Sequence, residues 1–279
     1  MKIPKSNLHT HTCFCDGKDT PAELVEKAIG EGMEVLGFSG HAYMPFDLDC
    51  CMMPDETEEY RREVLRLKQT CGDRLGILLG IEQDLFAEGD PTGYDYVIGS
   101  VHYMLLDGEY YAVDLSPEQT NEIVRRYFGG DVYRYLRHYY EMMAQMASKV
   151  PLDIVGHFDL ISKFNEGGCL FDESDPRYLR YAIDALDALL EKDLVFEINT
   201  GAISRGYRRT PYPSPIFLHR IAEKRGRVTF NSDAHRKENL LFGYADALHI
   251  ARAAGLGALT VMTRDGWREF SLSERSTCL

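Results

Sequence analysis

The chain lacks several features that would assign it to a simple class. No apolar stretch approaches the ~20 residues that a membrane-spanning helix requires, and residues 1–6 lack the apolar core of a signal peptide. Basic residues are outnumbered, with 31 Lys and Arg against 44 Asp and Glu and a formal net charge of −13. A protein that binds nucleic acid independently of its sequence needs a positively charged surface. We therefore expect no membrane span, no nucleic-acid partner and a cytoplasmic location.

Paired cysteine motifs are also missing. The seven cysteines include no C-x-x-C pair and no finger-like spacing. An odd number of scattered cysteines fits reduced thiols better than a disulfide framework. Cys13 and Cys15 adjoin the first histidine motif, but their sulfur is softer than the nitrogen and oxygen donors nearby. We therefore rank these two thiols below the neighbouring donors as metal ligands.

What the chain does have is a series of short apolar runs that end in imidazole or carboxylate. The runs cover residues 7–11, 35–41, 77–82, 97–102, 152–157, 195–199 and 228–235. Segments with helix signals separate them, which is the pattern of a parallel α/β fold. In parallel α/β barrels the active site gathers at the C-terminal ends of the strands. Seven clear strands in 279 residues predict one incomplete or distorted barrel domain.

The segments between the runs predict helices over residues 21–32, 57–70, 116–129, 131–149, 175–192, 214–225 and 238–254. Thr20 is a typical N-cap, with proline at the first helical position and Glu23 three residues after the cap. Residues 258–262 predict a short extra strand with no chemistry at its end. The longest insertion, at about 105–150, is expected to be helical. Its many tyrosines either cover the substrate as a lid or pack the helices against the barrel.

The polar residues at the run ends have the character of metal ligands. His9 and His11 are two residues apart, which on a strand places both rings on one face, ~7 Å apart at Cα. Glu82 ends an otherwise apolar run, and a buried carboxylate needs a compensating cation. Asp233 and His235 repeat the two-residue spacing. The set as a whole predicts a multinuclear metal site. The remaining histidines lie inside helical segments and are expected to be packing or surface residues: His138, His219 and His249.

The order of these motifs is distinctive. An H-T-H-T sequence near the N-terminus is followed by Ser39-Gly40-His41, Gly80-Ile81-Glu82, Gly99-Ser100-Val101-His102, Gly156-His157-Phe158-Asp159, Glu197-Ile198-Asn199-Thr200 and Ser232-Asp233-Ala234-His235. This order resembles the polymerase and histidinol phosphatase (PHP) family, and within it the monofunctional histidinol-phosphate phosphatases. The resemblance implies a distorted (β/α)7 barrel and the metal-dependent hydrolysis of L-histidinol phosphate to L-histidinol and phosphate.

The resemblance also implies two to three divalent ions, drawn from Zn, Fe and Mn. It implies that the first ion is held by His9, His11, Glu82 and Asp233. Glu82 would bridge to a second ion, which His102 and His157 also hold, and His41 and His235 would hold a third. Many family members add a histidine in the loop after H-x-H, but this chain has none between His11 and His41. Asp16 is the natural replacement.

The resemblance also implies that basic residues bind the phosphate group of the substrate. Arg205 matches the arginine beyond the sixth strand and ranks ahead of Arg208 and Arg209, and Lys163 is the candidate beyond the fifth. Two close metal ions lower the pKa of a shared water. We predict that Asp233, His235 and Arg205 take part in catalysis.

Two further residues are predicted to lie near the substrate. Ser100, next to His102, is placed to donate a hydrogen bond to a phosphate oxygen. Glu197 either meets a cationic amine of the substrate or orients a metal ligand. The sequence does not define an oligomeric state.

Two other functions stay open. The first is hydrolysis of another small phosphate ester, such as a nucleotide. The second is a metal-binding regulatory module without turnover, which the intact ligand set disfavours.

Overall fold

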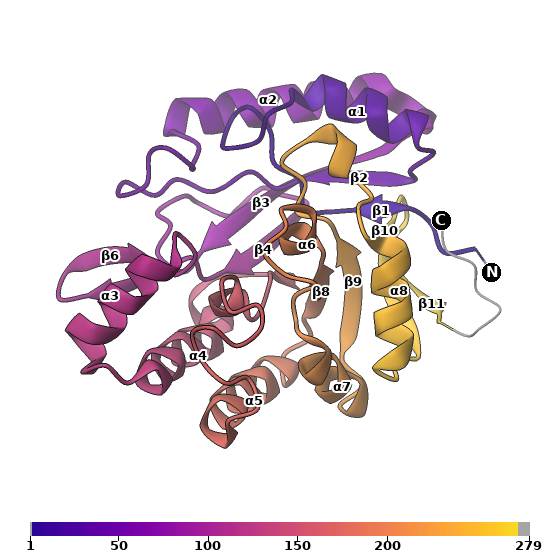
Figure 1. Ribbon diagram of the computed structural model, residues 1–279. Helices are drawn as coiled ribbons and strands as arrows, with labels where there is room; N and C mark the ends of the chain where they lie inside the picture. Colours follow the sequence, from indigo (N-terminus) through magenta and orange to yellow (C-terminus); the bar gives the residue numbers. More distant parts are fainter. Residues whose placement is uncertain (1, 273–279) are drawn as a thin grey trace.

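The computed structural model describes residues 2–272 and has a nearly closed barrel at its centre (Figure 1). Seven parallel strands pair in the order β1-β2-β3-β4-β7-β8-β9. They are β1 (Ser6–Asn7), β2 (Val35–Phe38), β3 (Gly76–Asp84), β4 (Tyr96–Ser100), β7 (Ile154–Val155), β8 (Val195–Asn199) and β9 (Arg227–Asn231). A parallel bridge between Thr10 and Ala234 brings the chain after β1 beside the chain after β9. The predicted seven-stranded barrel is therefore confirmed.

Helices lie around the outside of the barrel, except the short helix α6, which lies over the middle of the barrel in Figure 1. They are α1 (Pro21–Gly30), α2 (Pro54–Cys71), α3 (Pro117–Phe128), α4 (Val132–Lys149), α5 (Pro176–Leu190), α6 (Gly201–Ser204), α7 (Pro215–Glu223) and α8 (Tyr244–Ala253). The start of α1 follows its sequence signal, because the Thr20 side chain accepts from the backbone N–H of Glu23 and the Glu23 carboxylate accepts from that of Thr20. No helix within residues 2–272 is long and apolar enough to cross a lipid bilayer.

Three elements differ from the sequence prediction. The helix predicted to begin at Glu238 begins at Tyr244, because Gly243 has a φ of 71° and interrupts the helical path. Helix α2 begins at Pro54 rather than Thr57. The insertion predicted to be helical begins with a β-hairpin, β5 (Tyr103–Leu106) and β6 (Glu109–Ala112), which turns at Asp107 and Gly108 with φ of 50° and 86°. Such φ values suit a tight hairpin turn that a search for helix signals overlooks.

The predicted extra strand is present but lies outside the barrel sheet. It is β10 (Ala258–Thr263), and it pairs antiparallel with β11 (Gly266–Ser271). Most tyrosines of the insertion pack its helices against the rest of the protein, which was the alternative to a lid over the substrate. Tyr135, Tyr139 and Tyr140 on α4 are all at most 1% exposed.

Tyr96 fills the interior of the barrel below the polar strand ends. Its ring packs with a small apolar cluster, and its hydroxyl donates to the carbonyls of Leu8 and Phe38. A Cβ on Gly37 or Gly80 would lie 2.3 Å or 2.2 Å from atoms of this side chain. The two glycines therefore leave the space that the tyrosine occupies.

Candidate metal centre

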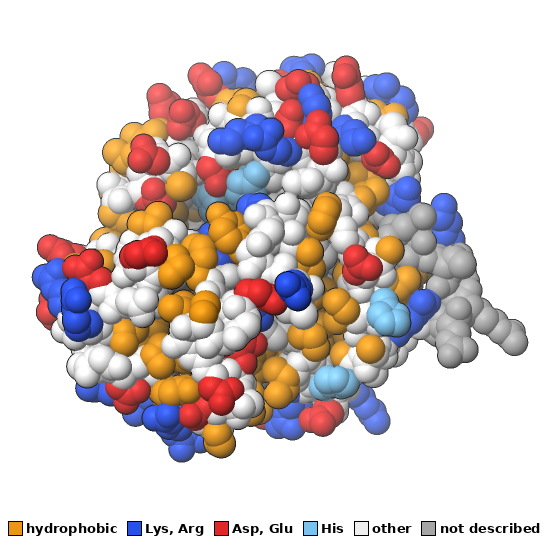
Figure 2. Space-filling model, in the orientation of Figure 1, with side chains coloured by type: hydrophobic (Ala, Val, Ile, Leu, Met, Phe, Trp, Pro, Cys, Tyr) orange, Lys and Arg blue, Asp and Glu red, His pale blue; other side chains and the backbone are white. Residues whose placement is uncertain are grey.

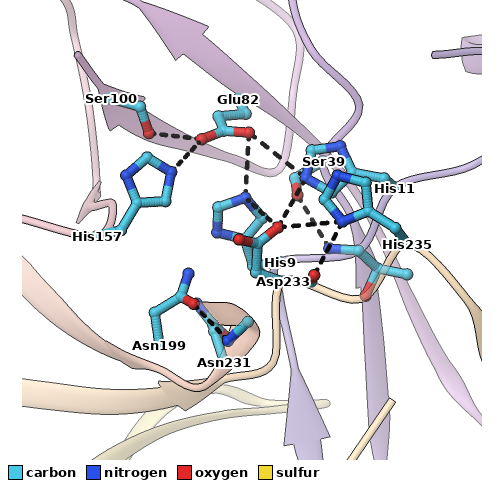
Figure 3. Close-up of polar contacts among 12 residues, drawn as sticks. His9, His11, Ser39, Glu82, Ser100, His157, Asn199, Asn231, Asp233 and His235 are labelled. Atoms are coloured by element: carbon cyan, nitrogen blue, oxygen red, sulfur yellow. Dashed lines mark hydrogen bonds and ion pairs between the residues drawn. The ribbon is translucent and has the colours of Figure 1, made fainter. Parts of the chain in front are cut away.

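The Glu82 carboxylate lies at the centre of a group of histidines at the C-terminal mouth of the barrel (Figure 3). Its Oε2 is 3.1 Å from Nε2 of His9, 3.2 Å from Nδ1 of His41 and 3.5 Å from Nε2 of His11. Its Oε1 is 2.9 Å from Nε2 of His157 and 3.4 Å from Nε2 of His102. Each oxygen thus faces a different set of imidazoles, the arrangement expected of a bridging carboxylate.

Asp233, which follows β9, faces the first histidine pair and His235. Its Oδ1 is 3.2 Å from Nε2 of His11 and 3.5 Å from Nδ1 of His235. Its Oδ2 accepts from Nη2 of Arg205 at 2.9 Å. The Asp233 backbone has a φ of 50°, which is uncommon outside glycine and often marks a functional site. A Cβ on Gly201 would lie 2.7 Å from Oδ2, so this glycine permits the arginine–aspartate pair.

Asp16 is brought over the centre by a loop that folds back on the first histidine pair. Its Oδ2 is 2.9 Å from Nε2 of His235, and its Oδ1 is 3.4 Å from Nδ1 of His11 and 3.8 Å from Nε2 of His41. A Cβ on Gly17 would lie 2.5 Å from the backbone nitrogen of Thr12. The Asp-Gly pair therefore allows a close backbone approach that places the carboxylate between three imidazoles.

The donor atoms converge in four overlapping groups, within each of which they lie within 4.8 Å of one another. The groups are His9, Glu82 and His157; His9, His11 and Asp233; His41, Glu82 and His102; and His11, Asp16, His41 and His235. Nε2 of His9, Nε2 of His11 and Oε2 of Glu82 are buried without a hydrogen-bond partner in the described part of the chain. Leaving such atoms unpaired costs ~1–3 kcal/mol each. Converging unpaired nitrogen and oxygen atoms fit a borderline-soft divalent cation.

The charge states of His11 and Glu82 suit the same interpretation. Burial lowers the pKa of His11 to about 3, and the neighbouring His235 and His41 add to the effect. The ring of His11 is therefore neutral at pH 7 and offers a lone pair. Burial alone would raise the pKa of Glu82, but His9 and His41 hold it well below its usual value.

Glu197 does not line the cavity, which corrects its expected contact with the substrate. The residue is 1% exposed, and its carboxylate accepts from Nδ1 of His9 at 2.9 Å and from the backbone N–H of His157 at 2.7 Å. Asn199 and Asn231 each donate to it at 2.8 Å. Glu197 therefore fixes the orientation of His9, the alternative role considered for it in the sequence.

Ser100 is also placed differently from its expected phosphate contact. It is fully buried, and its hydroxyl donates to Oε1 of Glu82 at 2.6 Å. A Cβ on Gly156 would lie 2.4 Å from this hydroxyl oxygen. Ser100 thus holds the central carboxylate, and it packs against the glycine that directly follows β7.

A cavity of about 350 Å³ opens above the centre, and histidine atoms are visible in a hollow below α1 and α2 in Figure 2. All the predicted ligands except His9 and His11 line it, together with Lys163 and Arg205. Both basic residues are already engaged, because Lys163 Nζ lies 2.9 Å from Oδ2 of Asp114 and Arg205 donates to Asp233. A phosphate contact stays a prediction for both residues.

The competing basic residues lie elsewhere. Arg208 is 7% exposed and donates to the Ser162 carbonyl and to Glu173, whereas Arg209 is 90% exposed at its side chain. The three helical histidines are absent from the metal-ligand groups found within residues 2–272. His219 and His249 are exposed, and His138 packs near Phe128.

Sequence reasoning missed two kinds of residue. Asp84 accepts from the His102 backbone N–H at 2.6 Å, and its carboxylate is 3.4 Å from Nδ1 of that ring. The spacing of two between Glu82 and Asp84 was an available signal, since both carboxylates lie on one face of β3. Asp47 and Asp114, which line the cavity, come from irregular segments where no periodicity could have indicated them.

Comparison with known proteins agrees with this geometry. Residues 7–201 match the model of the PHP domain. A Deinococcus radiodurans protein named "Probable histidinol-phosphatase" is 32% identical over 270 residues, covering 92% of this chain and 96% of its own length. The "Histidinol-phosphatase" of Bacillus subtilis is 27% identical, covering 87% and 97%.

A solved structure shares the fold. It is the histidinol phosphate phosphatase of Lactococcus lactis subsp. lactis, described as complexed with Zn, L-histidinol and phosphate. It superimposes with a TM-score of 0.67 at 20% sequence identity, covering 95% of this chain and 98% of that chain. The family match covers more than half of the sequence, and the resemblance noted in the motifs is confirmed. The chain belongs to the PHP domain family.

Proposed function

We propose that this chain is a metal-dependent phosphomonoesterase that hydrolyses L-histidinol phosphate to L-histidinol and phosphate. The observation that carries the proposal is the Glu82 carboxylate, which lies between two sets of histidines beneath a cavity that also bears Arg205 and Lys163. The names of the relatives from D. radiodurans and B. subtilis support the choice of substrate.

The residues of the centre divide naturally among two to three ions of Zn, Fe or Mn. In the proposal the first ion is held by His9, His11, Glu82 and Asp233, the second by Glu82, His102 and His157, and the third by Asp16, His41 and His235. The unpaired Nε2 atoms of the first histidine pair and the shared position of Glu82 support this division. When bound, such ions activate water and offset the negative charge of the phosphate.

Other side chains of the protein position the metal ligands and offer a contact for the phosphate. Glu197 and Ser100 orient the ligands from behind, so that the donor atoms are fixed before substrate arrives. Arg205 is held by Asp233 with its guanidinium on the cavity wall, where a planar donor pair suits phosphate oxygens. In this proposal Asp233 and His235 contribute to catalysis as ligands and Arg205 as a phosphate contact.

A panel of phosphate monoesters tests the proposal. We expect kcat/KM for L-histidinol phosphate to exceed that for p-nitrophenyl phosphate and for AMP by at least about a hundredfold, a gap of ~2.7 kcal/mol. Elemental analysis of the purified chain should find two to three ions. If AMP is the better substrate, the chain is a phosphoesterase for another small ester. If no ester is hydrolysed although the ions are present, the centre is a non-catalytic module.

We infer that the chain works in a reducing cytoplasm. The six cysteines within residues 2–272 are free thiols. This state fits a compartment in which glutathione keeps thiols reduced.

A further inference from the structure

Two carboxylates on the cavity wall come from outside the barrel strands. Asp47 lies in the loop between β2 and α2, and Asp114 lies between β6 and α3. Neither belongs to the metal-ligand groups found in the described chain. A phosphate pocket gains nothing from extra negative charge, so these two acids need another explanation.

Asp114 is neutralised by the protein itself. The Lys163 ammonium lies 2.9 Å from its Oδ2 and 2.9 Å from its backbone carbonyl. Burial would raise the pKa of this carboxyl, but Lys163 and the nearby His102 lower it. Asp114 is therefore charged and paired, and Lys163 is held at the cavity wall by that pair.

Asp47 has no comparable partner. Within residues 2–272 it forms no ion pair with any Lys, Arg or His; its partners are neutral groups, the hydroxyl of Tyr103, which donates to its Oδ2, and the thiol of Cys50. Burial and, after it, the carboxylates of Asp47, Asp16 and Asp114 raise the pKa of Cys50 on the same wall to about 12, which shows that this part of the cavity is negatively charged. A cationic ligand group would supply the missing counter-charge.

The position of Asp47 is fixed by aromatic packing. Phe46 stacks on Tyr110 with ring centroids 3.7 Å apart, and it meets Tyr103 edge-on at 5.0 Å. These contacts join the loop after β2 to the β5–β6 hairpin. Tyr103 directly follows His102, so the same contacts fix Asp47 relative to the metal centre.

Asp47 and Arg205 line the cavity from opposite sides. Asp47 follows β2 and Arg205 follows β8, and the strand order places these strands on opposite sides of the nearly closed barrel. We propose that Asp47, positioned by Tyr103, binds a cationic nitrogen group of the substrate, an ammonium or imidazolium, while the phosphate lies toward Arg205. The inference rests on the proposed function, because L-histidinol phosphate carries both groups beside its phosphate.

The experiment compares two substrates in wild type, Asp47→Asn and Tyr103→Phe. L-histidinol phosphate carries the cationic end, and p-nitrophenyl phosphate lacks it. We expect Asp47→Asn to lower kcat/KM for L-histidinol phosphate about ten- to hundredfold, mainly by raising KM. This loss should be at least about ten times larger than the loss of kcat/KM for p-nitrophenyl phosphate. Tyr103→Phe keeps the aromatic ring but removes the hydroxyl that donates to Asp47. It should therefore raise KM for L-histidinol phosphate by a smaller factor than Asp47→Asn does, with kcat little changed.

Asp49→Asn is the matched control, because this substitution removes the same charge as Asp47→Asn. Asp49 is exposed on the same loop and does not line the cavity. A selective loss in Asp47→Asn but not in Asp49→Asn supports the inference. Equal loss on both substrates, no loss, or the same loss in the control overturns it while the proposed function stands. A wild type that hydrolyses p-nitrophenyl phosphate but not L-histidinol phosphate overturns the proposed function, and the inference with it. Assaying a deaminated analogue of histidinol phosphate then separates ammonium from imidazolium recognition.

Discussion

At the scale of single residues, the two oxygens of Glu82 have different neighbours. Oε2 faces the first histidine pair and His41, whereas Oε1 faces His102 and His157 and accepts from Ser100. Each oxygen can therefore serve a different cation without any rotation of the side chain. In the proposed division of the ligands this carboxylate is the side chain shared by two ions, so its loss should affect two sites at once.

We expect Glu82→Ala to lose two ions per chain, because two sites share this ligand. Elemental analysis of the variant beside the wild type measures the change. His249→Ala is the control, since that histidine is exposed on α8 and should leave the metal content unchanged. Loss of one ion or none from Glu82→Ala would contradict the bridging role.

Asp16 offers an oxygen donor in the loop after H-x-H, where the family resemblance leads one to expect a histidine. Asp16→Ala should lose one ion and leave the other two, because its carboxylate lies between His11, His41 and His235 but does not contact Glu82. Metal content and kcat measured together check this. If both stay at the wild-type level, Asp16 serves only the turn that it forms with Gly17.

Arg205 holds Asp233 and faces the cavity at the same time. Arg205→Lys keeps the charge but loses the planar pair of donors, so kcat/KM should fall roughly ten- to hundredfold, as expected for a hydrogen bond to a charged group. Steady-state kinetics on L-histidinol phosphate measures the loss. Arg209→Lys, at a side chain 90% exposed, should match the wild type, and a similar loss in both variants would argue against a specific contact.

At the scale of elements, parallel strands explain why so much of the centre could be predicted. Their C-terminal ends meet at one edge of the barrel, so a histidine after one strand and a carboxylate after another become neighbours without any knowledge of the long-range fold. His102 and His157 are examples, from β4 and β7. The direction of each side chain within that edge is set by neighbouring strands. For this reason the sequence leaves two roles open for Glu197, and Ser100, expected at the phosphate, contacts Glu82.

The irregular elements could not be predicted in the same way. The β5–β6 hairpin turns at Asp107 and Gly108 with positive φ. Asp-Gly is a typical pair for such a turn, but the flanking segments, residues 103–106 and 109–112, do not alternate strictly between apolar and polar side chains. Asp47 reaches the cavity through aromatic contacts with that hairpin. Contacts of this kind join segments far apart in the chain and leave no periodic pattern.

The barrel interior offers a test of element packing. Gly80→Ala would place a Cβ 2.2 Å from the Tyr96 ring, and overpacking of this kind costs about 1–3 kcal/mol or more. Urea unfolding should show a lower midpoint with an unchanged slope. Gly30→Ala at the end of α1 is the control, because nothing lies within 4 Å of its added Cβ. A Gly80→Ala variant as stable as Gly30→Ala would show that Tyr96 can move aside.

At the scale of the whole molecule, the centre joins the two ends of the described barrel. The chain after β1 bridges to the chain after β9 through Thr10 and Ala234, and the ligands His9, His11 and Asp233 come from these two segments. Ions held between them would therefore close the barrel as well as serve the reaction. A ligand that binds only the folded state stabilises it, by ~2.7 kcal/mol at a free concentration one hundred times its Kd.

Metal removal should consequently lower the thermal stability. A change of 1 kcal/mol shifts Tm by about 2–4 °C in chains of 150–250 residues, so dialysis against a chelator should lower Tm by roughly 5–10 °C, and added Mn or Zn should restore it. Differential scanning calorimetry with parallel elemental analysis measures both quantities. The same treatment should shift Glu82→Ala much less, because that variant has lost two sites already. An unchanged Tm after complete removal of the ions would mean that the hydrogen bonds from Asn7 to Ser232 and from Leu8 to Asn231 suffice to close the barrel.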